Sequence, residues 1–209
     1  MRTRLLPKNL KLISGPDCPV CIAPDIDLQK IFFLLERKDI TTFGDMARDP
    51  FEGRSLFYYR SKRYDVRIVY SVFNALEIAK PVVYFAIGFE TTMPSTALAI
   101  LDGIENFYVF SAHRFFVLAS LGDVRIDGFI NLGHVSTIVG VKTYEHIKFP
   151  QVIASFESED VMLTLLMLIR MIKNGEVGVK NEYTRAVRYE GNLKVQKLMN
   201  DIFERKDWE

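Results

Sequence analysis

The sequence predicts an α/β protein: two αβα lobes with mostly parallel sheets facing a cleft, followed by a C-terminal helical tail. Short runs of β-branched and aromatic residues alternate with segments that carry apolar residues at helical spacing, a pattern typical of parallel strands joined by crossover helices. The chain has 209 residues, of which 49% are hydrophobic and 25% charged, which is enough to bury one core or two small ones. We therefore expect a globular fold.

The expected strands are short apolar runs rich in Val, Ile, Phe and Tyr, at residues 10–13, 40–43, 66–70, 82–87, 107–110, 128–130 and 152–154. The expected helices are the amphipathic stretches between them, at residues 28–36, 72–79, 96–101 and 160–172, and a last one within 191–203. In that last helix the apolar side chains share one face. We expect it to dock on the rest of the protein.

The doublet Lys80-Pro81 predicts a boundary between the lobes, because proline disfavours helix at the residue before it. The expected division is a first lobe at residues 1–80, a second lobe at 81–175, and a C-terminal connection with its helix at 176–209. No tandem repeat or low-complexity segment interrupts this order.

Composition and motifs argue against several functions. Lys and Arg number 27 against 26 Asp and Glu, a net charge of +1, so no single-signed field favours nucleic acid or an anionic membrane surface. The longest apolar stretches, 81–89 and 161–169, are shorter than the roughly 20 residues that span a bilayer. Neither of the glycine-rich patterns that bind nucleotide phosphates, G-x-x-x-x-G-K-S/T and G-x-G-x-x-G, is present, so the sequence gives no support for nucleotide binding. Because the basic start of the chain leads into no apolar signal region, we expect a cytoplasmic protein.

The chain's two cysteines, Cys18 and Cys21, lie in a Gly/Pro turn after an apolar run. Thiols at this spacing can ligate one metal ion or form a small disulfide ring, and a pair of buried free cysteines is the structural alternative. A closed zinc site needs four ligands, so this pair would form an open site suited to iron, copper(I) or zinc.

Polar residues follow several expected strands, where ligands gather in open α/β sheets. Glu90, Thr91 and Thr92 come after the run 82–87, and Pro94 follows them near the start of a helix. Glu90 could relay protons while the threonines hold a ligand; alternatively, these residues cap the helix and Glu90 pairs with a surface cation. His134 could be a ligand or an acid–base group, or a hydrogen-bonded structural histidine.

Six motifs occur together and in order. They are Gly15-Pro16-Asp17-Cys18-Pro19-Val20-Cys21, Thr42-Phe43-Gly44-Asp45-Met46, Asp65-Val66-Arg67-Ile68-Val69-Tyr70-Ser71, Ala86-Ile87-Gly88-Phe89-Glu90-Thr91-Thr92, Gly133-His134-Val135-Ser136-Thr137-Ile138 and Glu190-Gly191-Asn192. With them the chain resembles HypD, the nickel–iron hydrogenase maturation family.

The resemblance implies a scaffold, more than an enzyme, that assembles or carries an iron centre with cyanide and carbon monoxide ligands. It implies a HypC-like chaperone and a HypE-like cyanide donor as partners. It further implies that Cys18 and Cys21 bind iron or supply electrons by thiol–disulfide exchange. Glu90, Thr91, Thr92 and His134 are implied to line a cleft.

The chain departs from the family where Asp17 replaces a glycine, which places a negative charge that opposes thiolate formation beside Cys18. The resemblance covers the middle of the family only. We therefore expect the first strand of the first lobe, which carries a further cysteine, to be missing, and no iron–sulfur cluster to form, because the family's cluster domain is absent. The alternatives are a stand-alone dithiol–disulfide oxidoreductase using the same cysteines, or an inactive truncated fragment.

Overall fold

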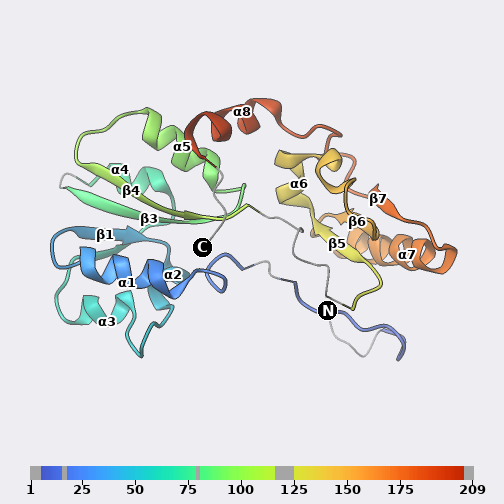
Figure 1. Ribbon diagram of the computed structural model, residues 1–209, viewed down its shortest axis with the longest axis horizontal. Helices are drawn as coiled ribbons and strands as arrows, with labels where there is room; N and C mark the ends of the chain where they lie inside the picture. The colour runs from blue at the N-terminus through green and yellow to red at the C-terminus, as the bar shows by residue number, and fades with distance from the viewer. Residues whose placement is uncertain (1–5, 16–17, 79–80, 116–124, 205–209) are drawn as a thin grey trace.

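The computed structural model describes residues 6–15, 18–78, 81–115 and 125–204, which form two parallel sheets with helices packed on them (Figure 1). The first sheet has the order β2-β1-β3-β4 and the second the order β5-β6-β7. The strands of the first sheet are β1 (Asp39–Thr42), β2 (Val66–Ile68), β3 (Val82–Gly88) and β4 (Phe107–His113). Those of the second are β5 (Phe129–Leu132), β6 (Pro150–Ala154) and β7 (Gly178–Asn181). The expected α/β class with parallel sheets is confirmed.

Strand β3 is the centre of the first lobe. All seven of its residues are buried, and it pairs in parallel with β1 on one side and with β4 on the other. Its side chains alternate between the two faces, as in any strand. Phe85 joins the core under α1, whereas Tyr84 joins a second core under α4 and α5.

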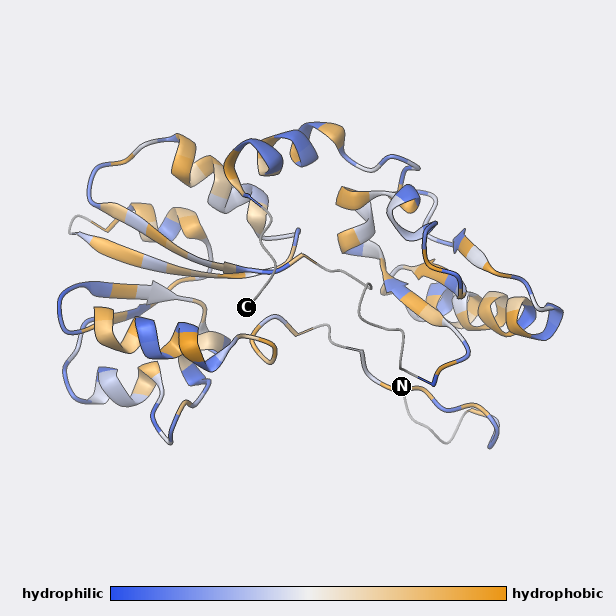
Figure 2. Cartoon of the chain, viewed as in Figure 1, coloured by the Kyte–Doolittle hydropathy of each residue, from blue (hydrophilic) through white to orange (hydrophobic). Residues whose placement is uncertain are grey.

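In the described part of the first lobe, five helices pack around the sheet: α1 (Asp25–Leu34), α2 (Gly44–Arg48), α3 (Leu56–Ser61), α4 (Val72–Leu76) and α5 (Met93–Leu101). Helix α1 buries Leu28 and Ile31 in the core that contains Phe85. Pro94 lies in the first turn of α5, as the sequence predicts. Figure 2 shows the apolar residues concentrated on β3 and β4 and the hydrophilic ones at the connections.

The second lobe is smaller. Its helices are α6 (Gly133–Val139), the 3-10 helix at Val141–Tyr144 and α7 (Ser158–Asn174). The central strand β6 contributes Ile153 to a core with Tyr144, and Val152 to a separate core with Leu168 and Met171 of α7. The sheet is therefore packed on both faces.

Within the described residues, no helix combines the length and the apolar character needed to cross a bilayer.

Helix α8 (Leu193–Ile202) joins the two lobes, because it packs against α5 of the first and α6 of the second (Figure 1). Asn192 caps it by accepting a hydrogen bond from the backbone N–H of Val195 at 3.2 Å. Gln196 donates to the carbonyls of Ile138 and Glu190, each at 2.7 Å. The C-terminal helix thus docks on the rest of the protein, as its apolar face predicts.

The lobes divide at a different place from the one expected. Strands β3 and β4 pair with β1, so residues 81–113 belong to the first sheet, and the Lys80-Pro81 doublet is not a boundary between sheets. Strand β7, within the expected tail, completes the second sheet. The expected strand at residues 10–13 is absent from the described structure, where Leu12 and Ile13 are exposed and pair with no other strand.

Candidate functional site at the carboxyl ends of the strands

Cys18 and Cys21 form a disulfide with their Cα atoms 5.3 Å apart. They lie in the turn before α1, and the backbone N–H of Cys21 donates to Sγ of Cys18 at 3.2 Å. Cys18 is half-buried and Cys21 is exposed. A disulfide with one exposed cysteine in a short ring can react with a reductant or a thiol partner, so this pair can exist in two redox states.

The described residues contain no group of three or more His, Cys, Asp or Glu side chains arranged to hold a metal ion. A metal bound by the reduced cysteine pair would therefore take its remaining ligands from elsewhere, such as a partner protein or small molecules. Such an open coordination sphere is typical of sites that exchange their metal or its ligands.

A buried ion pair lies at the start of α1. Asp27 is almost completely buried and accepts a hydrogen bond from the Arg114 guanidinium at 3.4 Å. Burial raises the pKa of the Asp27 carboxyl, and the positive charge of Arg114 opposes that shift. Arg114 directly follows β4, so the pair fixes the end of this strand against the helix that begins after the cysteines. Neither residue was among the predicted site residues.

The turn after β3 is built around Gly88, whose φ is +150°. A Cβ atom at this position would lie 1.8 Å from Oγ1 of Thr92, so only glycine fits. Thr92 donates its hydroxyl to the carbonyl of Phe89 at 3.1 Å and makes no side-chain cap to α5. Thr91 is exposed. Thr92, the residue at the N-cap of α5, therefore does not cap the helix with its side chain.

Glu90 is a buried acidic residue that follows β3, with 4% of its surface exposed. Its charge acts on Tyr144 of the second lobe. Burial raises the pKa of Tyr144, a hydrogen bond with Ser136 opposes the shift, and the carboxylate of Glu90 adds to it. Glu90 is therefore close enough to the second lobe to affect a side chain there electrostatically.

His134 follows β5 in the first turn of α6, and its ring centroid lies 5.0 Å from that of Phe156. Partial burial lowers the pKa of His134 below its usual value, which favours the neutral imidazole, the form that can ligate a metal or accept a proton. Gly133 allows this position, because a Cβ there would lie 2.3 Å from the carbonyl oxygen of Ala154.

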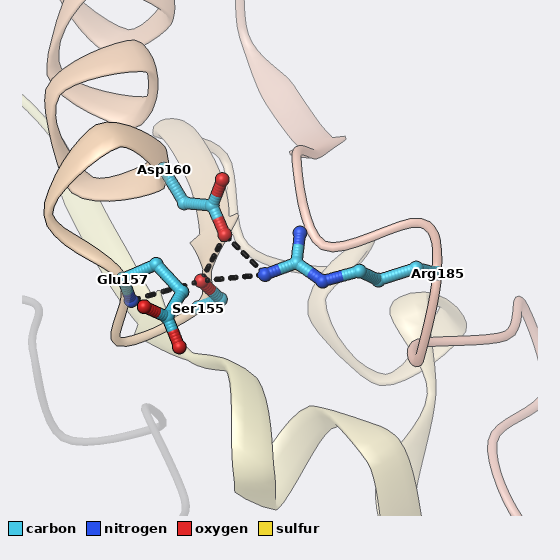
Figure 3. A network of polar contacts seen from close by, with 4 residues as sticks. All are labelled: Ser155, Glu157, Asp160 and Arg185. Atoms are coloured by element: carbon cyan, nitrogen blue, oxygen red, sulfur yellow. Dashed lines mark hydrogen bonds and ion pairs between the residues drawn. The ribbon is translucent and has the colours of Figure 1, made fainter.

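A polar network follows β6 and β7 (Figure 3). Ser155 donates its hydroxyl to the Asp160 carboxylate, and Arg185 pairs with that carboxylate and contacts the Ser155 oxygen at 3.2 Å. The backbone N–H of Glu157 donates to the same oxygen at 3.2 Å. The hydrogen bonds from Arg185 and Ser155 lower the pKa of Asp160, so this carboxyl is ionised at neutral pH.

The sequence matches one family over nearly its whole length. A profile described as "HypD: Hydrogenase formation hypA family" covers residues 2–209. The chain belongs to the HypD family.

Among its relatives is a putative hydrogenase expression/formation protein of Methanocaldococcus jannaschii, 40% identical over 97% of this chain and 62% of the relative. The hydrogenase maturation factor HypD2 of Bradyrhizobium diazoefficiens is 42% identical over 97% of this chain and 60% of its own length. The hydrogenase expression/formation protein HupD of Azotobacter chroococcum is 42% identical over 96% and 60%. The chain spans about three fifths of the length of these curated relatives.

In this HypD-family chain the cysteine pair and residues 90–92 belong to the first lobe, whereas His134 belongs to the second. The carboxyl ends of β3 and β4 point toward the second lobe, and that of β5 toward the first (Figure 1). Glu90, Thr91, Thr92 and His134 therefore come from strand ends that face one another, whereas the two cysteines lie in the turn before α1. That the two cysteines share one cavity with Glu90 and His134 stays a prediction.

Proposed function

We propose that this HypD-family chain acts in the maturation of nickel–iron hydrogenases, as a platform on which an iron centre with cyanide and carbon monoxide ligands is assembled or carried. The observation that carries the proposal is the Cys18–Cys21 pair. Its sulfurs lie close enough to bond, and the residue Cys21 is exposed. The names of the curated relatives, hydrogenase maturation or expression/formation factors, support the same role.

The cysteine pair links iron binding to redox state. Reduction of the disulfide consumes two electrons and two protons from a dithiol donor and yields two thiols. Binding of Fe²⁺ by both sulfurs then releases two protons, because only thiolates ligate the metal. Iron is the cargo in this scheme, and its other coordination positions stay open for diatomic ligands and for a ligand from a partner.

The residues at the facing strand ends complete the proposal. Glu90, Thr91 and Thr92 from the first lobe and His134 from the second are the candidates to line the assembly site. A neutral His134 and a buried carboxyl at Glu90 can accept and return protons as ligands are exchanged. A HypC-like chaperone and a HypE-like cyanide donor are the proposed partners.

Anaerobic titration of the reduced chain with Fe²⁺, with and without a HypC-like chaperone, tests the proposal. Wild type is expected to retain iron through gel filtration, and Cys18→Ser and Cys21→Ser are each expected to lose it. The control is Ser158→Ala, an exposed substitution outside the cysteine turn. Equal iron retention by all four proteins would rule out the cysteine pair as the iron site.

A second candidate function, dithiol–disulfide exchange with protein substrates, is favoured by the exposure of Cys21. Multiple-turnover reduction of a protein disulfide, without iron or a chaperone and lost in both cysteine variants, would favour it over the assembly platform.

A further inference from the structure

The first lobe contains a cavity that none of the predicted site residues lines. Its volume is about 580 Å³, and it lies where β1 and β2 end, between the connections that lead to α2 and α4. Its walls include Phe43, Arg48, Phe57, Arg60 and Tyr70. A cavity of this size fits a small organic molecule.

Two arginines give the cavity its charge. Arg48 belongs to α2 and Arg60 to α3, so each side chain starts from a helix on the wall. Both residues are exposed, and across residues 6–15, 18–78, 81–115 and 125–204 neither is ion-paired with a carboxylate. Four other described arginines, at positions 54, 67, 114 and 185, have acidic partners, and the remaining described ones, Arg170 among them, have none.

The acidic residue of the cavity does not neutralise this pair. Asp45 is the carboxylate among the lining residues, and it forms no ion pair with any described residue. Two guanidinium groups against one carboxylate leave a net positive charge. Planar guanidinium groups bind phosphate and carboxylate oxygens with paired hydrogen bonds.

Aromatic rings accompany the arginines. The guanidinium carbon of Arg48 lies 5.9 Å from the centroid of the Phe57 ring, which positions the charge over a flat apolar surface. Tyr70 stands on the opposite connection, after β2, with 92% of its surface exposed. A flat ring bound in the cavity would cover part of this exposed aromatic side chain.

We propose that this cavity binds a small organic anion, a phosphate ester or a carboxylate carried on a flat ring, with Arg48 and Arg60 holding the anionic group and Tyr70 stacking on the ring. The observations come from the first lobe alone. The proposal therefore stands independently of iron assembly at the cysteine pair.

Binding of phenyl phosphate, benzoate and inorganic phosphate to the full chain, measured by calorimetry and by NMR line broadening, tests the proposal. The two ring-bearing probes distinguish a phosphate from a carboxylate ligand. We expect at least one of them to bind about tenfold more tightly than inorganic phosphate. Arg48→Ala and Arg60→Ala are each expected to weaken that binding about tenfold or more, because each removes a charge-assisted hydrogen bond.

Tyr70→Ala distinguishes the contribution of ring stacking from that of anion binding. It should weaken binding of the ring-bearing probe and leave binding of inorganic phosphate unchanged. Arg170→Ala, an exposed arginine on α7 in the second lobe, is the matched control and should change nothing. Unchanged thermal unfolding of all variants shows that they are folded. The proposal is overturned if neither ring-bearing probe binds at about 10 mM, or if binding is the same in both cavity arginine variants as in Arg170→Ala.

Discussion

At the scale of single residues, the candidate site depends on positions that accept one residue type. Gly88 combines a positive φ with a Thr92 side chain packed where a Cβ would be. Gly133 brings the start of α6 against the end of β6, because a Cβ there would overlap the backbone carbonyl of Ala154. These glycines let Glu90 follow closely after the buried strand β3 and let His134 follow β5, and so they set where the two residues lie.

Gly88→Ala should therefore lower the free energy of unfolding by about 2 kcal/mol or more, since the new methyl group overlaps Thr92 and the backbone is strained for an L-residue. Urea unfolding measures the change. Gly15→Ala is the control, because no described atom beyond its chain neighbours lies within 4 Å of the place that its methyl group would take, and it should leave stability nearly unchanged. Equal effects of the two substitutions would show that the turn is not constrained as described.

His113 predicts a pH dependence of stability. Burial at the end of β4, against Thr96 of α5 and next to Phe203, lowers its pKa from 6.5 to about 4. Between these values the unfolded chain takes up a proton that the folded protein does not. The unfolding free energy should therefore fall as the pH drops from 6.5 toward 4, by on the order of 3 kcal/mol from this residue.

Urea unfolding of wild type and His113→Gln across that pH range tests this contribution. The variant should lose less stability on acidification than wild type, since glutamine does not titrate; other groups affect both proteins alike. If the unfolding free energies of the two proteins fall equally on acidification, His113 is not held buried and neutral in the folded protein.

At the scale of elements, the regular parts of the fold could be predicted from the sequence and the non-local pairings could not. The run 82–87 is apolar throughout and becomes the buried strand β3. Strand β7, Gly-Val-Lys-Asn, carries no such signal, because its place in the sheet is fixed by pairing with β6. The expected strand at 10–13 has the right residue types, but among the described residues no neighbouring strand pairs with it.

For the candidate site too, single residues could be predicted from the sequence, but pairs that meet only in the folded protein could not. Cys18, Cys21, Glu90 and His134 stand out by residue type and by position after apolar runs. The Asp27–Arg114 pair carries no such signal, because its members are 87 positions apart and meet only when α1 packs on the sheet that contains β4. Asp160 has the sequence signal of an acidic residue in a helix's first turn, but its partner Arg185 follows a strand that the pattern does not reveal.

The cap of α8 belongs to the element scale. Asn192→Ala removes the side-chain acceptor for the backbone N–H of Val195 and should lower the unfolding free energy by about 1 kcal/mol. Asn200→Ala, at an exposed position in the same helix, is the control; it should be neutral or slightly stabilising, because alanine is the better helix former. Chemical denaturation compares the unfolding free energies of the two variants. If Asn192→Ala lowers the unfolding free energy no more than Asn200→Ala does, the Asn192 side chain does not cap the helix.

At the scale of the whole molecule, two sheets present strand ends to one another and α8 connects their lobes. The Glu190-Gly191-Asn192 motif explains part of this connection. Gly140 and Gly191 approach closely, since a Cβ on Gly140 would lie 2.4 Å from the Gly191 nitrogen, and the Asn192 N–H donates to the Ile138 carbonyl at 2.9 Å. The second lobe and α8 are thereby held together, while α8 also packs on the first lobe.

We propose that the reduced Cys18–Cys21 pair holds iron as cargo. The most direct measurement is iron K-edge X-ray absorption of the anaerobically reduced chain loaded with Fe²⁺ in the presence of a HypC-like chaperone. We expect a sulfur shell around iron that shrinks in Cys18→Ser and in Cys21→Ser. Iron surrounded only by oxygen and nitrogen, with the same spectrum in wild type and both variants, would contradict it.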